Sequence, residues 1–276
     1  MNTVKKRSTT AIKRTCSVLI PALLGVGLLS PLPAEAASLI PVSLELQLLI
    51  DVSGSVNSRE YSLQLGGYQT AFTNLASRFG SGGFGDVAVN TVLWSGANQQ
   101  QVAIPWFLIN DATSALEFAN KIGSLNRPFA GTTAPGSAIN FAAPLFATNQ
   151  FAGKRWIIDV SGDGAQNQGY STSQARDRAL AMGVTAINGL PILIGNPNLL
   201  SWYQANLVGG QNSFAIAAGD FTKFGTAIEQ KLAREIEPIS TDIPEPNTVL
   251  ATLALGAYLT LGRIKRFQQQ KSNNPY

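Results

Sequence analysis

The sequence predicts an α/β fold: a mostly parallel central sheet with one antiparallel edge strand and helices on both faces. Two observations predict it. Strand-like and helix-like segments alternate along the chain, which is typical of a parallel sheet built from strand–helix–strand units. In addition, residues 44–51 form a nearly continuous apolar run, as expected of a strand buried on both faces.

The first predicted elements after that strand are one helix and a pair of strands. Residues 58–79 carry apolar side chains at helical spacing, so that one side of a helix is apolar. Residues 86–94 and 101–106 are typical of two strands joined by a turn around Gly96, which predicts the antiparallel corner of the sheet. The apolar side of the helix holds Tyr61, Leu65, Tyr68, Phe72 and Leu75.

The remaining elements alternate more regularly. Asp111 is a favourable residue at the start of a helix over 111–122. Pro135 fits the first turn of a helix over 135–146, where the missing amide costs no hydrogen bond. The other predicted elements are a buried strand at 154–161, a helix at 171–182, a strand within 184–194, a short helix at 199–207, a last strand at 214–218 and a last helix at 221–236.

The composition excludes several kinds of chemistry. The 276 residues include no His and a single Cys, which is Cys16 in the leader described below. A Ser-His-Asp triad, a Cys-His dyad, a His-ligated zinc and an imidazole base are therefore excluded. Carboxylates, hydroxyls and amides remain, and these favour hard cations bound through oxygen.

The N-terminus has the three-part pattern of a secretory signal. Basic residues precede an apolar run at about 18–29, and the small-residue site Ala34-Glu35-Ala36 follows. Residues 1–36 are therefore predicted to be a signal peptide; an uncleaved membrane anchor is the alternative. The apolar run is short of the roughly 20 residues that a membrane-spanning helix needs.

The C-terminus carries a second targeting pattern. Ile243-Pro244-Glu245-Pro246 leads into an apolar stretch at 248–261, and a basic cluster follows it. Residues 243–276 thus resemble the PEP-CTERM sorting signal of certain bacteria, which implies a short transmembrane helix and removal by an exosortase-type processing enzyme. A plain single-span anchor is the alternative. Both ends together predict export to the cell envelope, the outer surface or the extracellular space.

The charge balance changes when the two ends are set aside. The whole chain has a formal net charge of +4, with 20 Lys and Arg against 16 Asp and Glu. Residues 37–246 alone hold 11 Lys and Arg against 15 Asp and Glu, a net charge of −4. The basic excess belongs to the targeting segments, so no nucleic-acid partner is expected.

Three loops carry the residues that could bind a cation. The first strand ends in Asp51, Ser53 and Ser55, which lie on alternate positions and all offer side-chain oxygens. Asp163 follows the strand at 154–161, and Gly131-Thr132-Thr133 precedes the helix at 135. As βα-type loops at the carboxyl edge of a parallel sheet, they are expected to meet where ligands of such sheets bind. Taken singly, Asp163 could be a turn residue and either threonine a helix cap.

This constellation resembles a von Willebrand factor A domain with a metal-ion-dependent adhesion site. The family pattern is D-x-S-x-S after the first strand, a threonine in a later loop, and an aspartate in a strand-ending Asp-Gly. The resemblance implies metal ligands at Asp51, Ser53, Ser55, Thr133 and Asp163. Thr133 is preferred because it lies six residues before Ile139 of the following helix, as in the family; Thr132 is the competitor.

The resemblance extends to one bacterial branch of that superfamily known only as a domain of unknown function. It covers nearly all of residues 40–238 and implies a Rossmann-like von Willebrand factor A domain at 37–242. The stretches that carry it include Trp94-Ser95-Gly96, Pro105-Trp106, Ile187-Asn188-Gly189-Leu190-Pro191-Ile192, Val208-Gly209-Gly210 and the closing Lys231-Leu232 and Arg234-Glu235-Ile236.

The functional expectation is binding rather than catalysis. The adhesion mode that the resemblance implies uses Mg²⁺, or Mn²⁺ or Ca²⁺, to engage a carboxylate of a protein or glycan partner. One alternative is a Mg²⁺-dependent hydrolase at the same crevice, with Asp159 or a loop carboxylate as base. Another is a structural surface or matrix protein with a vestigial site. Basic residues such as Arg127 are expected to be solvated surface charges.

Overall fold

The computed structural model describes residues 38–238, so the predicted signal peptide (1–36) and sorting tail (243–276) lie outside the described residues. Within residues 38–238, no helix combines the length and the apolar character needed to cross a membrane. The strands are β1 (Ile40–Val42), β2 (Leu44–Asp51), β3 (Val87–Trp94), β4 (Gln100–Ile109), β5 (Phe151–Gly153), β6 (Trp156–Gly162), β7 (Ala186–Pro191) and β8 (Gly209–Gly210).

The helices lie close to the predicted ranges, and α2 and α3 follow one another with no strand between them. Three of the predicted helices each include a short 3-10 segment at one end. The helices are α1 (Ser58–Leu75), α2 (Ala112–Gly123), α3 (Pro135–Ala142), α4 (Thr172–Ala181), α5 (Leu199–Asn206) and α6 (Phe224–Ile236), and the 3-10 segments are η1 (Ala76–Arg78), η2 (Ala143–Thr148) and η3 (Phe221–Lys223).

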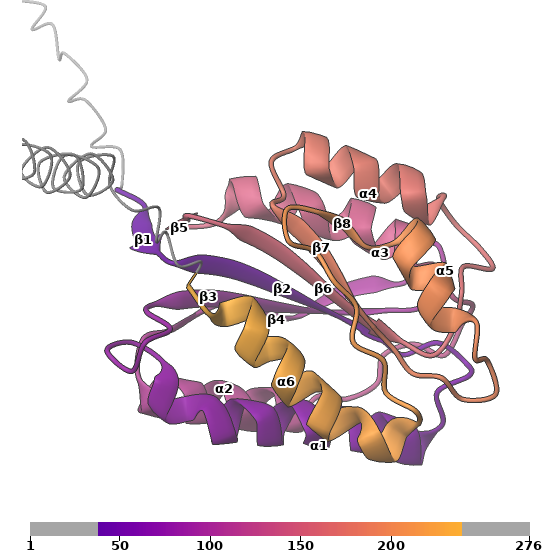
Figure 1. Cartoon of the computed structure of the whole chain (residues 1–276), viewed down its shortest axis with the longest axis horizontal. Coiled ribbons are helices and arrows are strands. Elements are labelled where there is room, and N and C mark those ends of the chain that lie inside the picture. The colour runs from indigo at the N-terminus through magenta and orange to yellow at the C-terminus, as the bar shows by residue number, and fades with distance from the viewer. Residues whose placement is uncertain (1–37, 239–276) are drawn as a thin grey trace, which may run out of the picture. The chain divides into compact units, whose positions relative to one another are not determined.

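A six-stranded sheet in the order β4-β3-β2-β6-β7-β8 forms the centre of the fold (Figure 1). The four inner strands are parallel to one another. β4 is antiparallel at one edge, and the two-residue β8 is antiparallel at the other. The predicted class, a mostly parallel α/β sheet with an antiparallel edge strand, is therefore confirmed.

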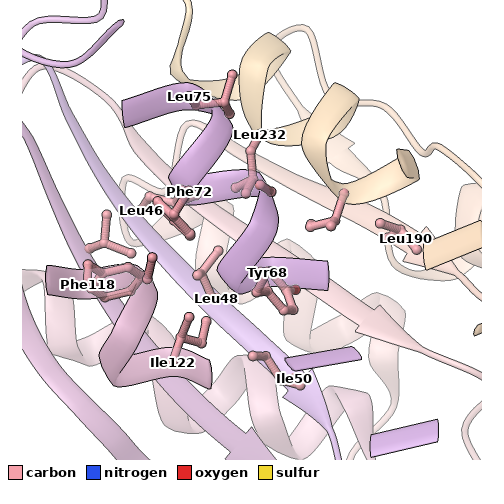
Figure 2. Packing of buried hydrophobic residues seen from close by; sticks show 14 of the residues in the cluster. Leu46, Leu48, Ile50, Tyr68, Phe72, Leu75, Phe118, Ile122, Leu190 and Leu232 are labelled. Carbon is pink, nitrogen blue, oxygen red and sulfur yellow. The ribbon is translucent and has the colours of Figure 1, made fainter. Parts of the chain in front are cut away.

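Helices cover both faces of this sheet. α1, α2 and α6 pack together on one face, and α3, α4 and α5 lie over the other (Figure 1). Side chains of a strand alternate between faces, so β2 serves both cores. Its Leu46, Leu48 and Ile50 pack toward α1 and α2, beside Phe72 and Phe118 (Figure 2). All eight residues of β2 are buried, which explains its nearly continuous apolar sequence.

The structure corrects one local prediction and shows one strand pair that the sequence did not predict. Residues 214–218 do not form a continuous strand: Ala215 and Ala218 make only isolated parallel bridges beside β7. The reason is that Pro191 has no amide hydrogen to donate, so the ladder is interrupted between Gly189 and Leu193, whose amides do bond this segment. In addition, β1 and β5 pair as a separate two-stranded parallel sheet, too short for a periodic pattern to reveal.

Candidate metal centre

The candidate site lies where two neighbouring strands end and their connections separate. β2 and β6 are adjacent and parallel, with Ile50 paired to Ser161. The chain leaves β2 for α1 on one face of the sheet and leaves β6 for α4 on the other. Such a topological switch point opens a crevice beyond the carboxyl ends of the strands, where ligands of open α/β sheets bind.

The loop after β2 is folded by its own polar groups. The buried Asp51 accepts a hydrogen bond from the Ser53 amide at 2.7 Å, which turns the chain back over the strand end. The Ser53 and Ser55 hydroxyls then lie 3.1 Å apart. Asn57 caps α1 by accepting from the amides of Arg59 and Glu60, so the loop passes directly into the helix.

The two other predicted segments meet this loop. The Ser55 hydroxyl donates to Asp163 Oδ1 at 2.6 Å, and Thr133 Oγ1 lies 3.5 Å from Ser53 Oγ. The chain thus brings Asp51, Ser53, Ser55, Thr133 and Asp163 together, although residues 55 and 163 are 108 positions apart in sequence.

The structure also separates the two candidate threonines. The Thr132 hydroxyl donates to the side chain of Gln168. The Thr133 hydroxyl instead faces the Ser53 hydroxyl. Thr133 is 6% exposed, and its amide is held by Asn167 Oδ1 at 2.9 Å. Its placement beside Ser53 is the one expected of the preferred candidate.

The position of the threonine loop corrects one expectation. Residues 124–134 do not follow a strand but join α2 on one face to α3 on the other, across the carboxyl edge of the sheet. Ser95, just after β3, fixes this crossing: its hydroxyl accepts from the Gly131 amide at 2.8 Å and donates to the Thr132 carbonyl at 3.1 Å. The Gly54 amide also donates to the Gly131 carbonyl at 2.7 Å.

Arg127 is not the solvated surface charge that the sequence predicts. Its guanidinium donates to the Val52 carbonyl at 2.9 Å and to the Ser53 carbonyl at 2.5 Å, so it fixes the backbone of the β2–α1 loop. The sequence does not identify Arg127, Ser95 or Asn167 as supports of the site, because each acts through a contact between segments far apart in the chain.

The electrostatics of the site favour a cation. Burial, and after it the negative charge of Asp163, raises the pKa of Asp51 to about 7. Burial also raises the pKa of Asp163. Asp51 Oδ2 is buried without any hydrogen-bond partner. A buried carboxylate oxygen without a partner is costly, and a metal ion is one of the groups that can satisfy it.

The donor set fits a hard divalent cation. It consists of two carboxylates and three hydroxyls, and residues 38–238 contain no cluster of three or more His, Cys, Asp or Glu that would suit a softer or more highly charged site. Gly162 keeps the site open, since a Cβ there would lie 2.7 Å from Asp51 Oδ2 and 3.0 Å from the Tyr203 hydroxyl.

Comparison with solved structures shows a fold shared with a pilus adhesin. The pilus adhesin SpaC from Lactobacillus rhamnosus GG matches with a TM-score of 0.51 and 13% identity, covering 72% of this chain and 31% of that chain. A von Willebrand factor type A protein from Catenulispora acidiphila matches with a TM-score of 0.49 and 17% identity, covering 72% of this chain and 43% of that one.

A third structure is proximal thread matrix protein 1 from the mussel byssus with a zinc-occupied MIDAS motif, at a TM-score of 0.49 and 16% identity, covering 72% of this chain and 49% of that chain. This chain therefore spans less than half the length of each of these three proteins. Among curated proteins, none matches the sequence.

Residues 41–240 match a family described as "Protein of unknown function (DUF1194)". The match covers more than half of the chain and nearly the whole of the described domain, including all five residues of the candidate site. The protein therefore belongs to the DUF1194 family.

Proposed function

We propose that this protein is an exported binding protein that uses a divalent cation to engage an acidic group of a protein or glycan partner. The observation that carries the proposal is the buried, unpartnered Asp51 Oδ2, beside four further oxygen-bearing side chains from three separate loops. These side chains come from distant segments of the chain, and binding of a shared cation would account for their convergence.

The chemistry of the five side chains leaves room for a partner. Mg²⁺ takes about six oxygens, and Mn²⁺ and Ca²⁺ also bind through carboxylate and hydroxyl oxygens. The five residues supply at most five ligands if each gives one oxygen. With only two carboxylates, a divalent cation would keep affinity for an external anion, which a carboxylate of the partner can provide.

The same site is poorly equipped for hydrolysis. A general base must lie within hydrogen-bond reach of the proton that it abstracts. The suggested base Asp159 lies instead on the face of the sheet covered by α6, where Lys231 Nζ is 2.5 Å from its Oδ1. The absence of His from the whole chain removes the commonest alternative base.

Export and release are proposed from the sequence ends. We infer that residues 1–36 direct secretion and that residues 243–276 act as a PEP-CTERM tail, which anchors the chain in the membrane until an exosortase-type enzyme removes it. Mass spectrometry of the protein recovered from the producing cells tests this inference: the tail peptides are expected to be missing from the mature form.

The binding proposal is tested by calorimetry and by capture. Full-length protein is titrated with MgCl₂, MnCl₂ and CaCl₂, and at least one cation is expected to bind at a single site. Immobilised protein is then exposed to an envelope extract in that cation or in EDTA, with Asp51→Asn as the blank. Absence of heat with all three cations contradicts the proposal, as does capture of the same partner by the blank in EDTA.

The two threonines offer a matched pair of variants. Thr133→Val keeps the shape of the side chain but removes the hydroxyl beside Ser53, so cation affinity is expected to fall by about tenfold or more, as when a metal site loses a polar partner. Thr132→Val removes a hydroxyl that bonds Gln168 and is expected to leave the affinity within about twofold. Calorimetry of both variants decides; equal losses would contradict the assignment of Thr133.

A further inference from the structure

A second cluster of reactive groups lies in the core, away from the candidate metal centre. Lys231 and Glu235 of α6 meet Asp159 of β6 and Asn188 of β7. All four are buried: the Lys231 and Asp159 side chains have no exposed surface, and Asn188 and Glu235 are 1% and 2% exposed. Charged residues are almost never fully buried unless they are paired, so this cluster needs a physical account.

The amine of Lys231 makes two different contacts. It donates a hydrogen bond to Glu235 Oε1 at 2.5 Å, and Glu235 is also held by Asn188 Nδ2 at 2.8 Å. The same amine lies 2.5 Å from Asp159 Oδ1, yet neither oxygen of Asp159 has a hydrogen-bond partner. Lys231 therefore forms a buried ion pair with Asp159 in an orientation that is not a hydrogen bond, while Glu235 Oε1 is the hydrogen-bond acceptor of its amine.

The surroundings of the cluster favour neutral groups. Burial, and after it the charge of Asp159, raises the pKa of Glu235 to about 8, so its carboxyl group holds a proton at neutral pH. Tyr68 faces the cluster from α1, and burial raises the pKa of its hydroxyl well above the ordinary value, so it remains uncharged. The Phe214 ring lies 5.8 Å from the Lys231 amine.

We propose that Lys231 and Asp159 condense into an intramolecular amide that links α6 covalently to β6, with Glu235 as the proton carrier. The Lys231 Nζ forms a bond to the side-chain carbonyl carbon of Asp159, one carbon–oxygen bond of that carboxyl group breaks, and the oxygen leaves as water. One proton passes from Nζ to the departing oxygen directly. Starting from the ion pair of the Lys231 ammonium and the Asp159 carboxylate, Glu235 gives that oxygen a second proton and takes one back from Nζ. Nζ thus loses two protons, the amide keeps one, and Glu235 ends as it began.

Close contact between the two groups and exclusion of water favour this condensation, which does not proceed readily in aqueous solution. Two reacting groups held in contact react as if at very high concentration, with effective molarities of about 10⁵–10⁸ M for well-oriented pairs. The released water also has a route out, because Asn188 and Glu235 line a surface pocket of about 590 Å³. The reaction needs no oxidant, reductant or further substrate, and it is independent of cation binding.

The link can be read directly from a tryptic digest of the denatured full-length protein. Trypsin releases Asp159 in peptide 156–176 and Lys231 in peptide 224–234, where cleavage after Lys231 divides the second peptide. A link predicts one species that joins the two peptides, is uncleaved at Lys231 and is lighter than their sum by one water molecule. Complete recovery of the unlinked peptides, cleaved at Lys231, overturns the proposal.

Three comparisons make this result specific. Asp163-Gly164 can lose a water by cyclising within peptide 156–176, but that change cannot join two peptides. The exposed pair Lys121 and Glu117, 3.2 Å apart, is expected to stay unlinked in the same digest. A Lys231 peptide joined to the peptide that begins at Glu235, instead of to peptide 156–176, would overturn the assignment of Asp159.

The role of Glu235 is tested separately. In Glu235→Gln the side-chain carbonyl oxygen can still accept the hydrogen bond from Asn188. The amide cannot transfer a proton, however, so the linked fraction is expected to fall at least tenfold. Linking at the wild-type level in that variant overturns the role given to Glu235. Because the wild-type digest needs no variant, a failure of Glu235→Gln to fold leaves the main test intact.

Discussion

Replacing Asp51 with asparagine is expected to abolish divalent-cation binding while leaving a folded protein. The substitution keeps the size of the side chain and an oxygen that can accept from the Ser53 amide, but it removes the charge and the unpartnered Oδ2. At a cation concentration of a hundred times the dissociation constant, the wild-type protein is expected to gain about 2.7 kcal/mol of stability. Denaturant unfolding is expected to show none of this gain in Asp51→Asn.

The control for this prediction is Asp177→Asn. Asp177 carries the same charge but is 64% exposed on α4, paired with its neighbour Arg176. This variant is expected to keep the full cation-dependent gain, because a surface ion pair contributes little to stability. A gain that survives in Asp51→Asn would remove this carboxylate from the proposed ligand set.

Replacing Trp94 with alanine is expected to cost about 3–5 kcal/mol of unfolding free energy, the range for truncating a large buried aromatic side chain. Trp94 ends β3, pairs with Asp51 in register, and is fully buried in the core beneath α3. Its carbonyl also accepts from the Val52 amide at 2.8 Å, so the residue lies directly behind the candidate site. Urea denaturation of the purified variant measures the loss.

Trp94→Phe separates packing from hydrogen bonding. The indole Nε1 of Trp94 is buried without a partner, so phenylalanine loses no hydrogen bond and keeps most of the aromatic volume. We expect this variant to retain most of the stability that alanine loses. Similar losses in both variants would mean that the tryptophan side chain is needed for more than the space it fills.

An EDTA comparison distinguishes binding from a purely structural role. In the vestigial-site alternative the five side chains would be remnants, and unfolding would occur at the same temperature with cation and with EDTA. The binding proposal instead predicts a higher unfolding temperature in the presence of the cation, because a ligand that binds only the folded state stabilises it. A metal-dependent turnover of simple phosphoesters that disappears in Asp51→Asn would favour the hydrolase alternative.

The local part of the candidate site could be predicted from sequence. Asp51, Ser53 and Ser55 follow a strand that its apolar sequence marks as central, so their place at the carboxyl edge of the sheet was expected. The family resemblance favours Thr133 over Thr132, because Thr133 has the family's spacing to the following helix, and the structure turns the two hydroxyls to different partners. Arg127 could not be predicted as a support of the site, because its contacts with the β2–α1 loop join segments more than 70 positions apart.

The core cluster shows the same limit more clearly. Lys231 and Glu235 are spaced like an ordinary exposed pair on a helix, and Asp159 is a single charge within a strand. Only the packing of α6 against β6 and β7 places all of them out of water and in contact. A residue's burial depends on what the rest of the chain lays over it, so spacing along one helix cannot reveal it.

Periodicity, composition and short motifs predict the alternation of strands and helices, the buried central strand and the oxygen-only chemistry of any metal site, because these features are local. The five residues proposed to form that site are implied by the resemblance to a known family. The tertiary structure alone decided that residues from three loops meet at the point where the connections of β2 and β6 diverge, and that Lys231 faces Asp159. These are contacts between distant segments, fixed by strand order and by which face of the sheet each helix covers.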